Sequence, residues 1–531
     1  MSALLELSNV QLDFHKAKST KRVIDDITFS LQEGEILGIV GESGSGKTMT
    51  SLSIMGLLPS SASLTGNIHY KEKNLLSLKE EEYRKIRGKE IAMIFQEPMT
   101  SLNPLLTIGE QIEEMLDIHE PVSYKFTKED EGKKRVFLSM EDAGLKEPDI
   151  LYKKYPHELS GGMRQRVMIA MAMILRPKIL IADEPTTALD VTMQKKILEL
   201  IQHLNKTYNT SVILISHDLG VIKTICQRAL VMKDGKIEEM GNITDLFLNP
   251  RKEYTKNLIN SMPSMEKGLS IYKKDGREKE AFLPKKENLL LVKDVSVYYK
   301  EKPQGIFGKK SKKQAVKQAS LQLSQGETLG IVGESGSGKS SLAKAIVGLN
   351  KDIEGSIDCN GVKPQMVFQD PYSSLNPVKR IGQILEEPLL LSKIKNKAER
   401  QQKIEEVLQE VGLKPEHKNR YPSELSGGQR QRVAIAVALI QNTKLIVLDE
   451  PVSALDVTIQ AQILTLLKRL QKEHDLSYLF ISHDLNVVSQ LCNRVCVMHN
   501  GEIIESGDLL TIFKNPQKEY TQILLQSVLS S

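Results

Sequence analysis

The chain carries one long pattern twice. The string GIVGESGSGKT at 38–48 returns as GIVGESGSGKS at 330–340, and YPHELSGGMRQRVMIAMAM at 155–173 returns as YPSELSGGQRQRVAIAVAL at 421–439. The second pair of strings and everything after it keep a constant offset of 266 residues between the copies. Because the shared pattern extends over most of each half, the repeat indicates two copies of one whole domain rather than a short structural unit.

The expected boundaries follow from this duplication. We predict a first domain at 1–262, a charged linker at 263–287 that contains Gly and Pro, and a second domain at 288–531. A length of 531 residues agrees with more than one hydrophobic core.

The hydrophobic pattern of each copy predicts an α/β fold. The opening segments 4–14 and 289–299 alternate like strands of a half-buried sheet, whereas later runs such as KILIAD at 178–183 are continuously apolar, as in buried parallel strands. Segments such as 191–205 have helical spacing between them. We therefore expect a mainly parallel β core with an antiparallel β subdomain and a helical subdomain in each copy.

The repeated glycine-rich string predicts a phosphate site. It satisfies G-x-x-x-x-G-K-[ST] after the apolar run 36–40 and before a helix-like segment. Glycines let backbone N–H groups surround phosphate oxygens, Lys47 adds positive charge toward the β- and γ-phosphates, and Thr48 can ligate Mg²⁺. A flexible Gly-Ser turn would explain the glycines but not the Lys-Thr pair. The second copy offers Lys339 and Ser340, so the pattern predicts two sites for ATP and Mg²⁺.

Paired carboxylates end a predicted strand in each copy. Asp183 is suited to the Mg²⁺ shell and Glu184 to accepting a proton from the attacking water. His217 lies 33 residues after Glu184, within Ser-His-Asp-Leu, and can bridge that carboxylate and the γ-phosphate. A single histidine is more often structural, but the same spacing recurs in the second copy. The corresponding residues there are Asp449, Glu450 and His483.

Bulk properties exclude several functions. Apolar runs are about half the ~20 residues needed to span a bilayer, and the N-terminus lacks the pattern of a signal peptide. A net charge of +5 gives little attraction to nucleic acid, and four cysteines make no disulfide framework. We expect a cytoplasmic protein. The lysine-rich run at 302–317 is read as a solvated loop, with membrane or nucleic-acid binding as the alternatives.

The strings LSGGM at 159–163 and LSGGQ at 425–429 resemble the signature of ABC transporter ATPases, and the resemblance covers nearly the whole chain. It implies a role in catalysis and Mg²⁺ binding for Gln96 and Gln369, and adenine stacking by Phe14 and Tyr299, although Tyr298 is an alternative. It also implies that the signature of one domain closes the nucleotide site of the other. The implied first site comprises Phe14, Gly41, Ser43, Gly44, Ser45, Gly46, Lys47 and Thr48 with Ser426, Gly427, Gly428 and Gln429. The implied second site comprises Tyr299, Gly333, Ser335, Gly336, Ser337, Gly338, Lys339 and Ser340 with Ser160, Gly161 and Gly162. Asp190 and Asp456, each in an Ala-Leu-Asp string, resemble the D-loop of the family and are also expected to contact nucleotide.

Neither implied site lacks its glutamate or histidine, so we expect both to hydrolyse ATP. Met163 stands where the signature usually has glutamine. We therefore do not expect a glutamine hydrogen bond to the ribose or to the other domain at that site, but we expect the chemistry to be the same.

Within that family, the chain looks like the importers for dipeptides, oligopeptides and nickel, and most like fused members such as those for glutathione and peptide-like toxins. The tails NPRKEYTKNLINSMP and NPQKEYTQILLQSVL carry this likeness. No cysteine-rich segment follows them, so no iron–sulfur site is expected, and Cys226 and Cys492 are read as core residues.

The resemblance also implies partners. These are two transmembrane permease subunits and an extracytoplasmic solute-binding protein. The chain would then attach to the cytoplasmic face of the bacterial membrane through the permeases, without nucleic acid and without an obligatory homodimer. The cargo stays open among peptide, glutathione, nickel and a metal chelate. The competing hypothesis is a twin-domain protein that acts on ribosomes, which the short linker disfavours.

Overall fold

The computed structural model describes residues 3–16, 19–97, 101–120, 129–187, 189–274, 287–300, 312–370, 374–453 and 455–529. The chain divides into two compact units, of which the first extends essentially to Met262 and the second begins essentially at Pro263. Residues 275–286 of the predicted linker and 302–311 of the lysine-rich run lie outside the described residues.

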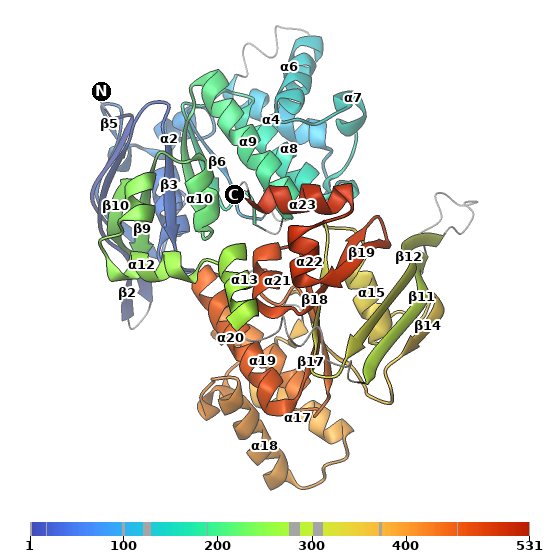
Figure 1. Ribbon diagram of the computed structural model, residues 1–531. Helices are drawn as coiled ribbons and strands as arrows, with labels where there is room; N and C mark the ends of the chain where they lie inside the picture. The colour runs from blue at the N-terminus through green and yellow to red at the C-terminus, as the bar shows by residue number, and fades with distance from the viewer. Residues whose placement is uncertain are drawn as a thin grey trace. The chain divides into compact units, whose positions relative to one another are not determined.

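Unit 1 contains two sheets (Figure 1). The antiparallel sheet has the order β2-β1-β4-β5, and the mainly parallel sheet has the order β10-β9-β3-β8-β7-β6 with only β10 antiparallel to its neighbour. The strands are β1 Leu5–Lys16, β2 Ser19–Leu31, β3 Ile36–Gly41, β4 Ala62–Tyr70, β5 Lys73–Asn74, β6 Ile91–Ile94, β7 Ile179–Asp183, β8 Ser211–Ser216, β9 Arg228–Lys233 and β10 Lys236–Asn242.

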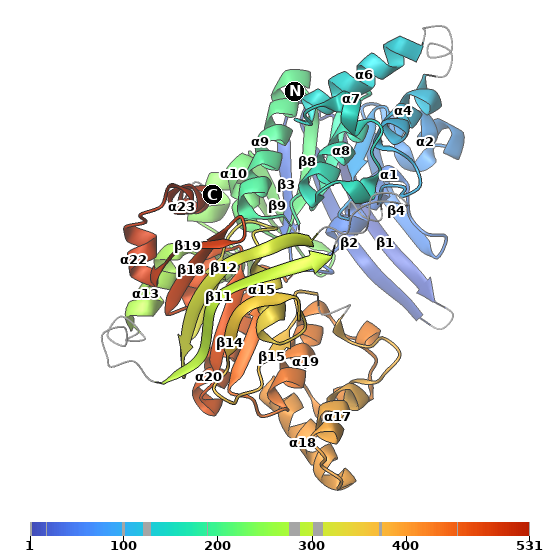
Figure 2. The same cartoon turned by 90° about the vertical axis from the view of Figure 1, so that its right-hand side faces the viewer.

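Helices of unit 1 cover the parallel sheet, and α4, α6 and α8 gather at one end as a helical subdomain (Figure 2). The helices are α1 Lys47–Met55, α2 Glu80–Ile86, α4 Ile108–His119, α6 Glu129–Asp142, α7 Pro148–Leu151, α8 Gly161–Met173, α9 Val191–Tyr208, α10 Leu219–Ile225, α11 Ile243–Leu248 and α12 Glu253–Ser261, with 3₁₀ turns η1 Leu75–Ser77 and η2 Pro156–Glu158.

Unit 2 repeats this plan. Its antiparallel sheet is ordered β12-β11-β14 and its mainly parallel sheet β15-β16-β17-β13-β18-β19. The strands are β11 Asn288–Lys300, β12 Lys312–Ser324, β13 Thr328–Val332, β14 Ile353–Asp358, β15 Gln365–Val367, β16 Leu445–Asp449, β17 Ser477–Ser482, β18 Arg494–His499 and β19 Glu502–Asp508. The helices are α13 Met265–Lys274, α15 Lys339–Ile346, α17 Ile381–Leu391, α18 Lys397–Glu410, α19 Gly427–Leu439, α20 Val457–His474, α21 Leu485–Leu491, α22 Leu509–Lys514 and α23 Glu519–Leu529, with 3₁₀ turns η3 Pro415–Asn419 and η4 Pro422–Glu424.

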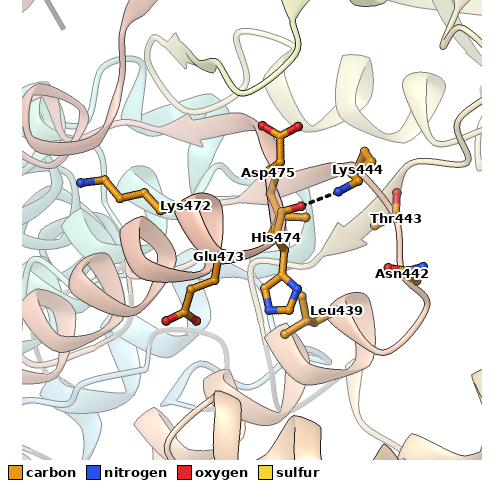
Figure 3. A pocket seen from close by; sticks show the side chains of 9 residues that line it. Leu439, Asn442, Thr443, Lys444, Lys472, Glu473, His474 and Asp475 are labelled. Atoms are coloured by element: carbon orange, nitrogen blue, oxygen red, sulfur yellow. Dashed lines mark hydrogen bonds between the residues drawn. The ribbon is translucent and has the colours of Figure 1, made fainter. Parts of the chain in front are cut away.

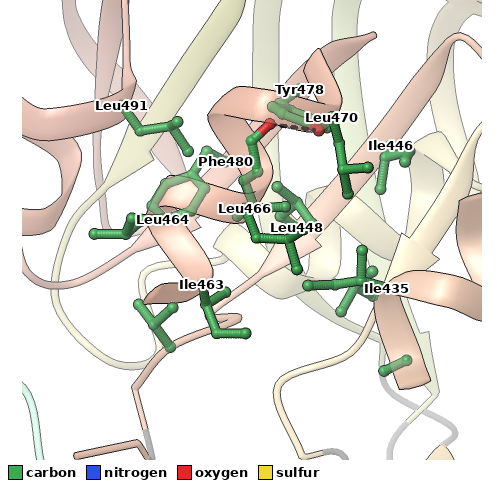
Figure 4. Close-up of a cluster of buried hydrophobic side chains, with 14 of the residues drawn as sticks. Ile435, Ile446, Leu448, Ile463, Leu464, Leu466, Leu470, Tyr478, Phe480 and Leu491 are labelled. Atoms are coloured by element: carbon green, nitrogen blue, oxygen red, sulfur yellow. Dashed lines mark hydrogen bonds between the residues drawn. The ribbon is translucent and has the colours of Figure 1, made fainter. Parts of the chain in front are cut away.

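Both faces of each parallel sheet are buried, because side chains alternate between two cores. In β17, Tyr478 and Phe480 enter the core shared with α19 and α20, whereas Leu479 and Ile481 enter the core shared with the antiparallel sheet. Figure 4 shows the first of these cores, where Phe480 lies among leucines and isoleucines of α20 and β16. Burial on both faces explains why these strands read as continuous apolar runs. The expected α/β architecture with its three parts is confirmed in each unit.

Part of the segment expected to be a linker is ordered. Residues 265–274 form α13, in which Tyr272 is 1% exposed and belongs to the core of unit 2. Charge and glycine in this stretch suggested a solvated chain, but Met265, Gly268 and Tyr272 fall on one face of the helix and are buried there.

Candidate active sites

Each phosphate loop is a tight turn that only glycine permits at its first residue. Strand β3 ends at Gly41, where a Cβ atom would stand 2.2 Å from the carbonyl oxygen of Met232 in β9. At Gly333 in unit 2 the same atom would stand 2.1 Å from the carbonyl oxygen of Met498. Each loop closes at a glycine with φ near 104°, Gly46 or Gly338, from which α1 or α15 begins.

The loop lysines lie over these turns. Lys47 Nζ donates to the carbonyl oxygens of Gly41 at 2.7 Å and Glu42 at 2.9 Å, and Lys339 Nζ donates to the equivalent oxygens of Gly333 and Glu334, both at 2.8 Å. Both lysine residues are buried, and burial lowers the pKa of Lys339. A buried cation held at a loop of backbone N–H groups favours a bound anion.

A glutamine, a glutamate and a histidine meet beside each loop. Gln96 Nε2 donates to Glu184 Oε2 at 2.8 Å, and His217 Nδ1 lies 3.2 Å from the same oxygen. In unit 2 the corresponding distances to Glu450 Oε2 are 2.8 Å from Gln369 Nε2 and 3.2 Å from His483 Nδ1. The structure thus brings together all six residues that the sequence assigned to catalysis, three in each unit.

Backbone conformation aims the two glutamates. Glu184 has φ 48° and Glu450 has φ 47°, in the left-handed region that non-glycine residues rarely adopt. Their N–H groups still donate to the carbonyl oxygens of Ile215 and Ile481, at 2.9 and 3.0 Å, in the neighbouring strand. Such a conformation costs about 1–3 kcal/mol and persists where the surroundings enforce it, commonly at functional sites.

The histidines set the charge of the glutamates. Burial raises the pKa of Glu184, but the hydrogen bond and positive charge of His217 outweigh it and lower that pKa to about 2. Burial likewise opposes the shift at Glu450, where His483 lowers the pKa below 4.5. For His483, burial lowers the pKa, and the hydrogen bond and charge of Glu450 reverse that effect and raise it above 6.5. Both carboxylates are therefore ionised at neutral pH.

The preceding aspartates suit a cation. Asp183 is 1% exposed, and among the described residues its Oδ1 atom is buried without a hydrogen-bond partner. Burial raises the pKa of Asp183 to about 6 and also raises that of Asp449, whose Oδ1 accepts a hydrogen bond from Ser340 Oγ at 2.9 Å. Carboxylate and hydroxyl oxygens are the hard ligands that Mg²⁺ prefers, so buried aspartates at these positions fit a Mg²⁺ ion.

The signature turns cap exposed helix N-termini. Ser160 Oγ accepts from the Met163 N–H at the start of α8, and Ser426 Oγ accepts from the Gln429 N–H at the start of α19. Gly162 lies against α9, where a Cβ atom would meet Met193 Cε at 2.3 Å, and Gly428 lies likewise against Ile459. Among the described residues, no atom would lie within 4 Å of a Cβ atom on Gly161.

The two candidate aromatic residues of unit 2, Tyr298 and Tyr299, have different hydrogen-bond partners in the structure. Tyr299 is 39% exposed, and its hydroxyl donates to Ser341 Oγ of α15 at 3.3 Å, next to the phosphate loop. The hydroxyl of Tyr298 instead donates to Glu354 of β14. Phe14 occupies the equivalent place on β1 and packs against the core of its unit. The position of Tyr299 favours it over Tyr298 for contact with a base.

Four further assigned residues can be placed in the loops and at the starts of helices. Ser45 and Ser337 are buried within the loops, whereas Asp190 and Asp456 immediately precede α9 and α20. Pairing of a loop in one domain with a signature in the other stays a prediction.

Sequence reasoning missed two tyrosines at the loops. The Glu42 N–H donates to Tyr254 Oη at 3.3 Å, and the Glu334 N–H donates to Tyr520 Oη at 3.1 Å. Both tyrosines belong to the repeated K-E-Y-T string, whose duplication was the available signal. Thr187 was also missed, and its Oγ1 donates to Glu184 Oε2 at 2.9 Å.

Unit 2 also has a surface cavity, whose lining side chains are drawn in Figure 3. It has a volume of about 270 Å³ and is lined by Leu439 and by residues of the segments 442–444 and 472–476, which precede β16 and β17. It is thus at the amino ends of these strands, whereas Asp449 and Glu450 are at the carboxyl ends, where ligands of open parallel sheets bind.

The fold and the two clusters define a protein with two phosphate-loop nucleotide sites of one kind. The ABC transporter family model matches residues 24–187 and 316–453, more than half of the chain, and the model for the C-terminal region of oligopeptide/dipeptide transporters matches 239–284 and 504–531. The chain therefore belongs to the ABC transporter family, and its two ATPase domains bind ATP.

Curated relatives align over nearly the full length. The chain is 43% identical to the peptidoglycan transport ATP-binding protein YejF of Agrobacterium fabrum, with 98% of this chain and 96% of that protein covered. It is 42% identical to an uncharacterised ABC transporter ATP-binding protein YejF of Escherichia coli, with 98% and 99% covered. It is 39% identical to the glutathione import ATP-binding protein GsiA of Salmonella choleraesuis, with 99% and 89% covered.

Solved structures share the two-domain fold. The RNase-L inhibitor aligns with a TM-score of 0.60 at 19% identity over 97% of this chain and 92% of that chain. An archaeal ribosome recycling factor, aABCE1, solved with a ribosomal stalk protein, aligns with a TM-score of 0.59 at 20% identity over 95% and 90%. At these identities the likeness shows the fold alone.

In the described part of the chain, no helix is long and apolar enough to cross a membrane.

Proposed function

We propose that the chain is the ATP-hydrolysing subunit of a bacterial importer for peptides or a related small solute, such as glutathione, nickel or a metal chelate. Two relatives named for peptidoglycan transport and for glutathione import support this, as does the match of both tails to the oligopeptide/dipeptide transporter region. The observation that carries the hydrolytic part is the Gln–Glu–His cluster beside each lysine loop.

In this proposal Glu184 and Glu450 accept a proton from the water that attacks the γ-phosphate. The histidine and the glutamine contact Oε2 of each carboxylate, and in this proposal Oε1 orients the water. The lysines attract the β- and γ-phosphates. Because Glu184 and Glu450 are ionised, both sites are competent to turn over.

Mg²⁺ bound with ATP would neutralise charge on the β- and γ-phosphates. We infer that Thr48, Asp183 and Gln96 hold it in the first site and Ser340, Asp449 and Gln369 in the second. The buried, unpartnered Oδ1 of Asp183 supports this assignment.

We further propose that each nucleotide is enclosed by the lysine loop of one domain and the signature turn of the other. The family resemblance supports this, and so do the exposed serines and helix N-termini at both signature turns, which suit a terminal phosphate.

The expected partners are two permease subunits and an extracytoplasmic solute-binding protein. Attachment to the cytoplasmic face of the membrane would then occur through the permeases. Affinity purification of the full chain from membranes tests this: we expect two integral membrane proteins to copurify. Cosedimentation with ribosomes, without membrane proteins, would instead support the competing ribosomal function.

Replacing Glu184 and Glu450 together with Gln tests the chemistry. We expect ATP binding to persist and phosphate release to fall by about 10²–10⁴-fold, because the water loses its general base. Binding of a fluorescent ATP analogue and steady-state phosphate release are measured, with Glu199→Gln on the exposed face of α9 as the control. Rapid steady hydrolysis by the double variant would refute the assigned base.

Each single replacement then tests the equivalence of the sites. Because both clusters have the same geometry, we expect either single variant to be strongly impaired. Full activity of one of them would show that the altered site is silent.

A further inference from the structure

Helix α13 packs against the helix that follows the catalytic histidine of unit 2. Its buried face consists of Met265, Gly268 and Tyr272, whereas Glu266, Lys267, Ser270, Lys273 and Lys274 are exposed on the other face. Met265 and Tyr272 enter the core that contains Leu485, Val488 and Leu491 of α21. The docking is thus made by a continuous apolar stripe.

The contact is closest at Gly268. A Cβ atom at this position would lie 1.8 Å from Ser489 Oγ, 2.5 Å from Ser489 Cβ and 2.9 Å from the Ser489 carbonyl carbon. Glycine lowers helix stability by about 0.5–1 kcal/mol relative to alanine, so its presence inside α13 is explained by this approach and not by helix formation. Ser489 itself is fully buried.

Helix α21 is therefore held on two sides. On a neighbouring face it rests on β13, where a Cβ atom at Gly330 would meet Cys492 Sγ at 3.0 Å and Val488 Cγ1 at 3.1 Å. Tyr272 Oη also lies 3.5 Å from the carbonyl oxygen of Asn493, and the Asn493 side chain accepts from the N–H of Thr328, the first residue of β13. Strand β13 leads directly into the phosphate loop.

The corresponding helix of unit 1, α10, makes the same contact with its sheet. Ile222 and Cys226 of α10 press on Gly38 of β3, just as Val488 and Cys492 press on Gly330. Lys223, which corresponds to Ser489, is exposed, and so is Thr224. The two units share one sheet contact at this helix but differ on its outer face.

We propose that Gly268 and Tyr272 are positioning residues for the second ATP site: α13 fixes α21 and, through it, His483 against Glu450. His483 and the capping Asp484 directly precede α21, so a shift of this helix moves the imidazole that holds the carboxylate. Hydrolysis at the second site then depends on a segment that follows the first domain in sequence, whereas hydrolysis at the first site does not. This inference rests on the proposed hydrolytic roles of His483 and Glu450.

The primary test is amide hydrogen exchange on the full-length Gly268→Ala variant. Alanine favours the helix but cannot occupy the space beside Ser489. We expect peptides covering 483–492 to exchange at least about 10-fold faster than in the wild type, while peptides covering 217–226 are unchanged. Unchanged exchange at 483–492 would overturn the proposal, and equal acceleration in both regions would replace it with general destabilisation. This measurement requires no ATP turnover.

Kinetics separate a positioning role from a structural one. We expect Gly268→Ala to lower kcat by about 10-fold or less with KM for ATP within about twofold, because misplacement of the histidine affects the attacking water more than binding of ATP. Ser270→Ala, on the exposed face of α13, is the matched control. A change confined to KM would contradict the inference.

A second variant guards against simple misfolding. Adding Ser489→Gly to Gly268→Ala removes both the Cβ and the Oγ atoms that the new methyl group would meet, so partial recovery of kcat and of slow exchange at 483–492 is expected. No recovery in either measurement would overturn the proposed contact. If the wild type itself hydrolyses no ATP, the proposed function fails; if it does and Gly268→Ala is normal in all measurements, only this inference fails.

Discussion

A tyrosine hydroxyl accepts a hydrogen bond from the residue after the first glycine of each phosphate loop. Tyr254 lies at the start of α12 and accepts from the Glu42 N–H, and Tyr520 lies at the start of α23 and accepts from the Glu334 N–H. In both pairs the tyrosine follows its donor by more than 180 residues in the sequence. Tyr520 also contacts the ring of His499, with centroids 3.9 Å apart. These single side chains connect the tail of each domain to its phosphate site.

Replacing Tyr520 with Phe should weaken ATP binding at the second site. The Glu334 N–H would lose its acceptor, and a hydrogen bond of this kind contributes about 1 kcal/mol, which corresponds to an approximately fivefold higher Kd. Titration of the protein with ATP by calorimetry measures this, and Tyr298→Phe, whose hydroxyl donates to Glu354 of β14, serves as the control. An unchanged Kd would show that the loop keeps its shape without the hydroxyl.

The helices that carry the signatures are capped differently. At α19, Ser426 accepts from the Gln429 N–H while the Gln429 side chain accepts from the Ser426 N–H at 3.1 Å, a reciprocal capping box. At α8, only the Ser160 side chain caps, because Met163 has no oxygen to return the bond. The departure seen in the sequence at Met163 therefore removes a bond within the turn itself.

Replacing Gln429 with Met should remove this reciprocal bond. We expect the capping bond to contribute about 0.5–1 kcal/mol to the stability of α19, a small value because the bond is exposed. Loss of this bond should have little effect on ATP hydrolysis. Denaturant unfolding of the full chain reports the loss, and Gln409→Met at an exposed position of α18 controls for the change of side chain. A large fall in kcat with unchanged stability would instead give Gln429 a direct role at the nucleotide.

On the scale of the whole molecule, each unit has two cores that flank its parallel sheet. Unit 1 uses Val212 and Leu214 of β8 for one core and Ile213 and Ile215 for the other. Unit 2 divides the residues of β17 in the same way. Two separate pairs of cores predict that the chain does not unfold in a single two-state step.

Calorimetry should accordingly resolve two unfolding transitions. Phe480→Ala creates a cavity in unit 2 and should lower the free energy of unfolding of that unit by about 3–5 kcal/mol. We therefore expect the temperature of one transition to fall while that of the other stays nearly unchanged. Ile213→Ala in unit 1 should lower the other transition. If both variants shifted a single common transition equally, the two units would be one cooperative structure.

The fold, the family and the ATPase class could be predicted from the sequence because they depend on residue types at short spacing. A lysine after a glycine loop, an Asp-Glu pair after an apolar run and a histidine after the next such run identify Lys47, Glu184 and His217 wherever the fold places them. Their duplication also predicted two domains, and the α/β class and the family are confirmed.

What only the tertiary structure decided are contacts between segments far apart in the chain. The left-handed backbone of Glu184 is imposed by its strand neighbours, and the hydroxyl of Tyr254 meets a loop more than 200 residues earlier. The charged composition around α13 suggested solvent, but its helical periodicity places Tyr272 in a core supplied by unit 2. The local sequence pattern predicts the secondary structure and the chemistry of a segment. Burial and backbone strain depend instead on which other segments the fold packs against it.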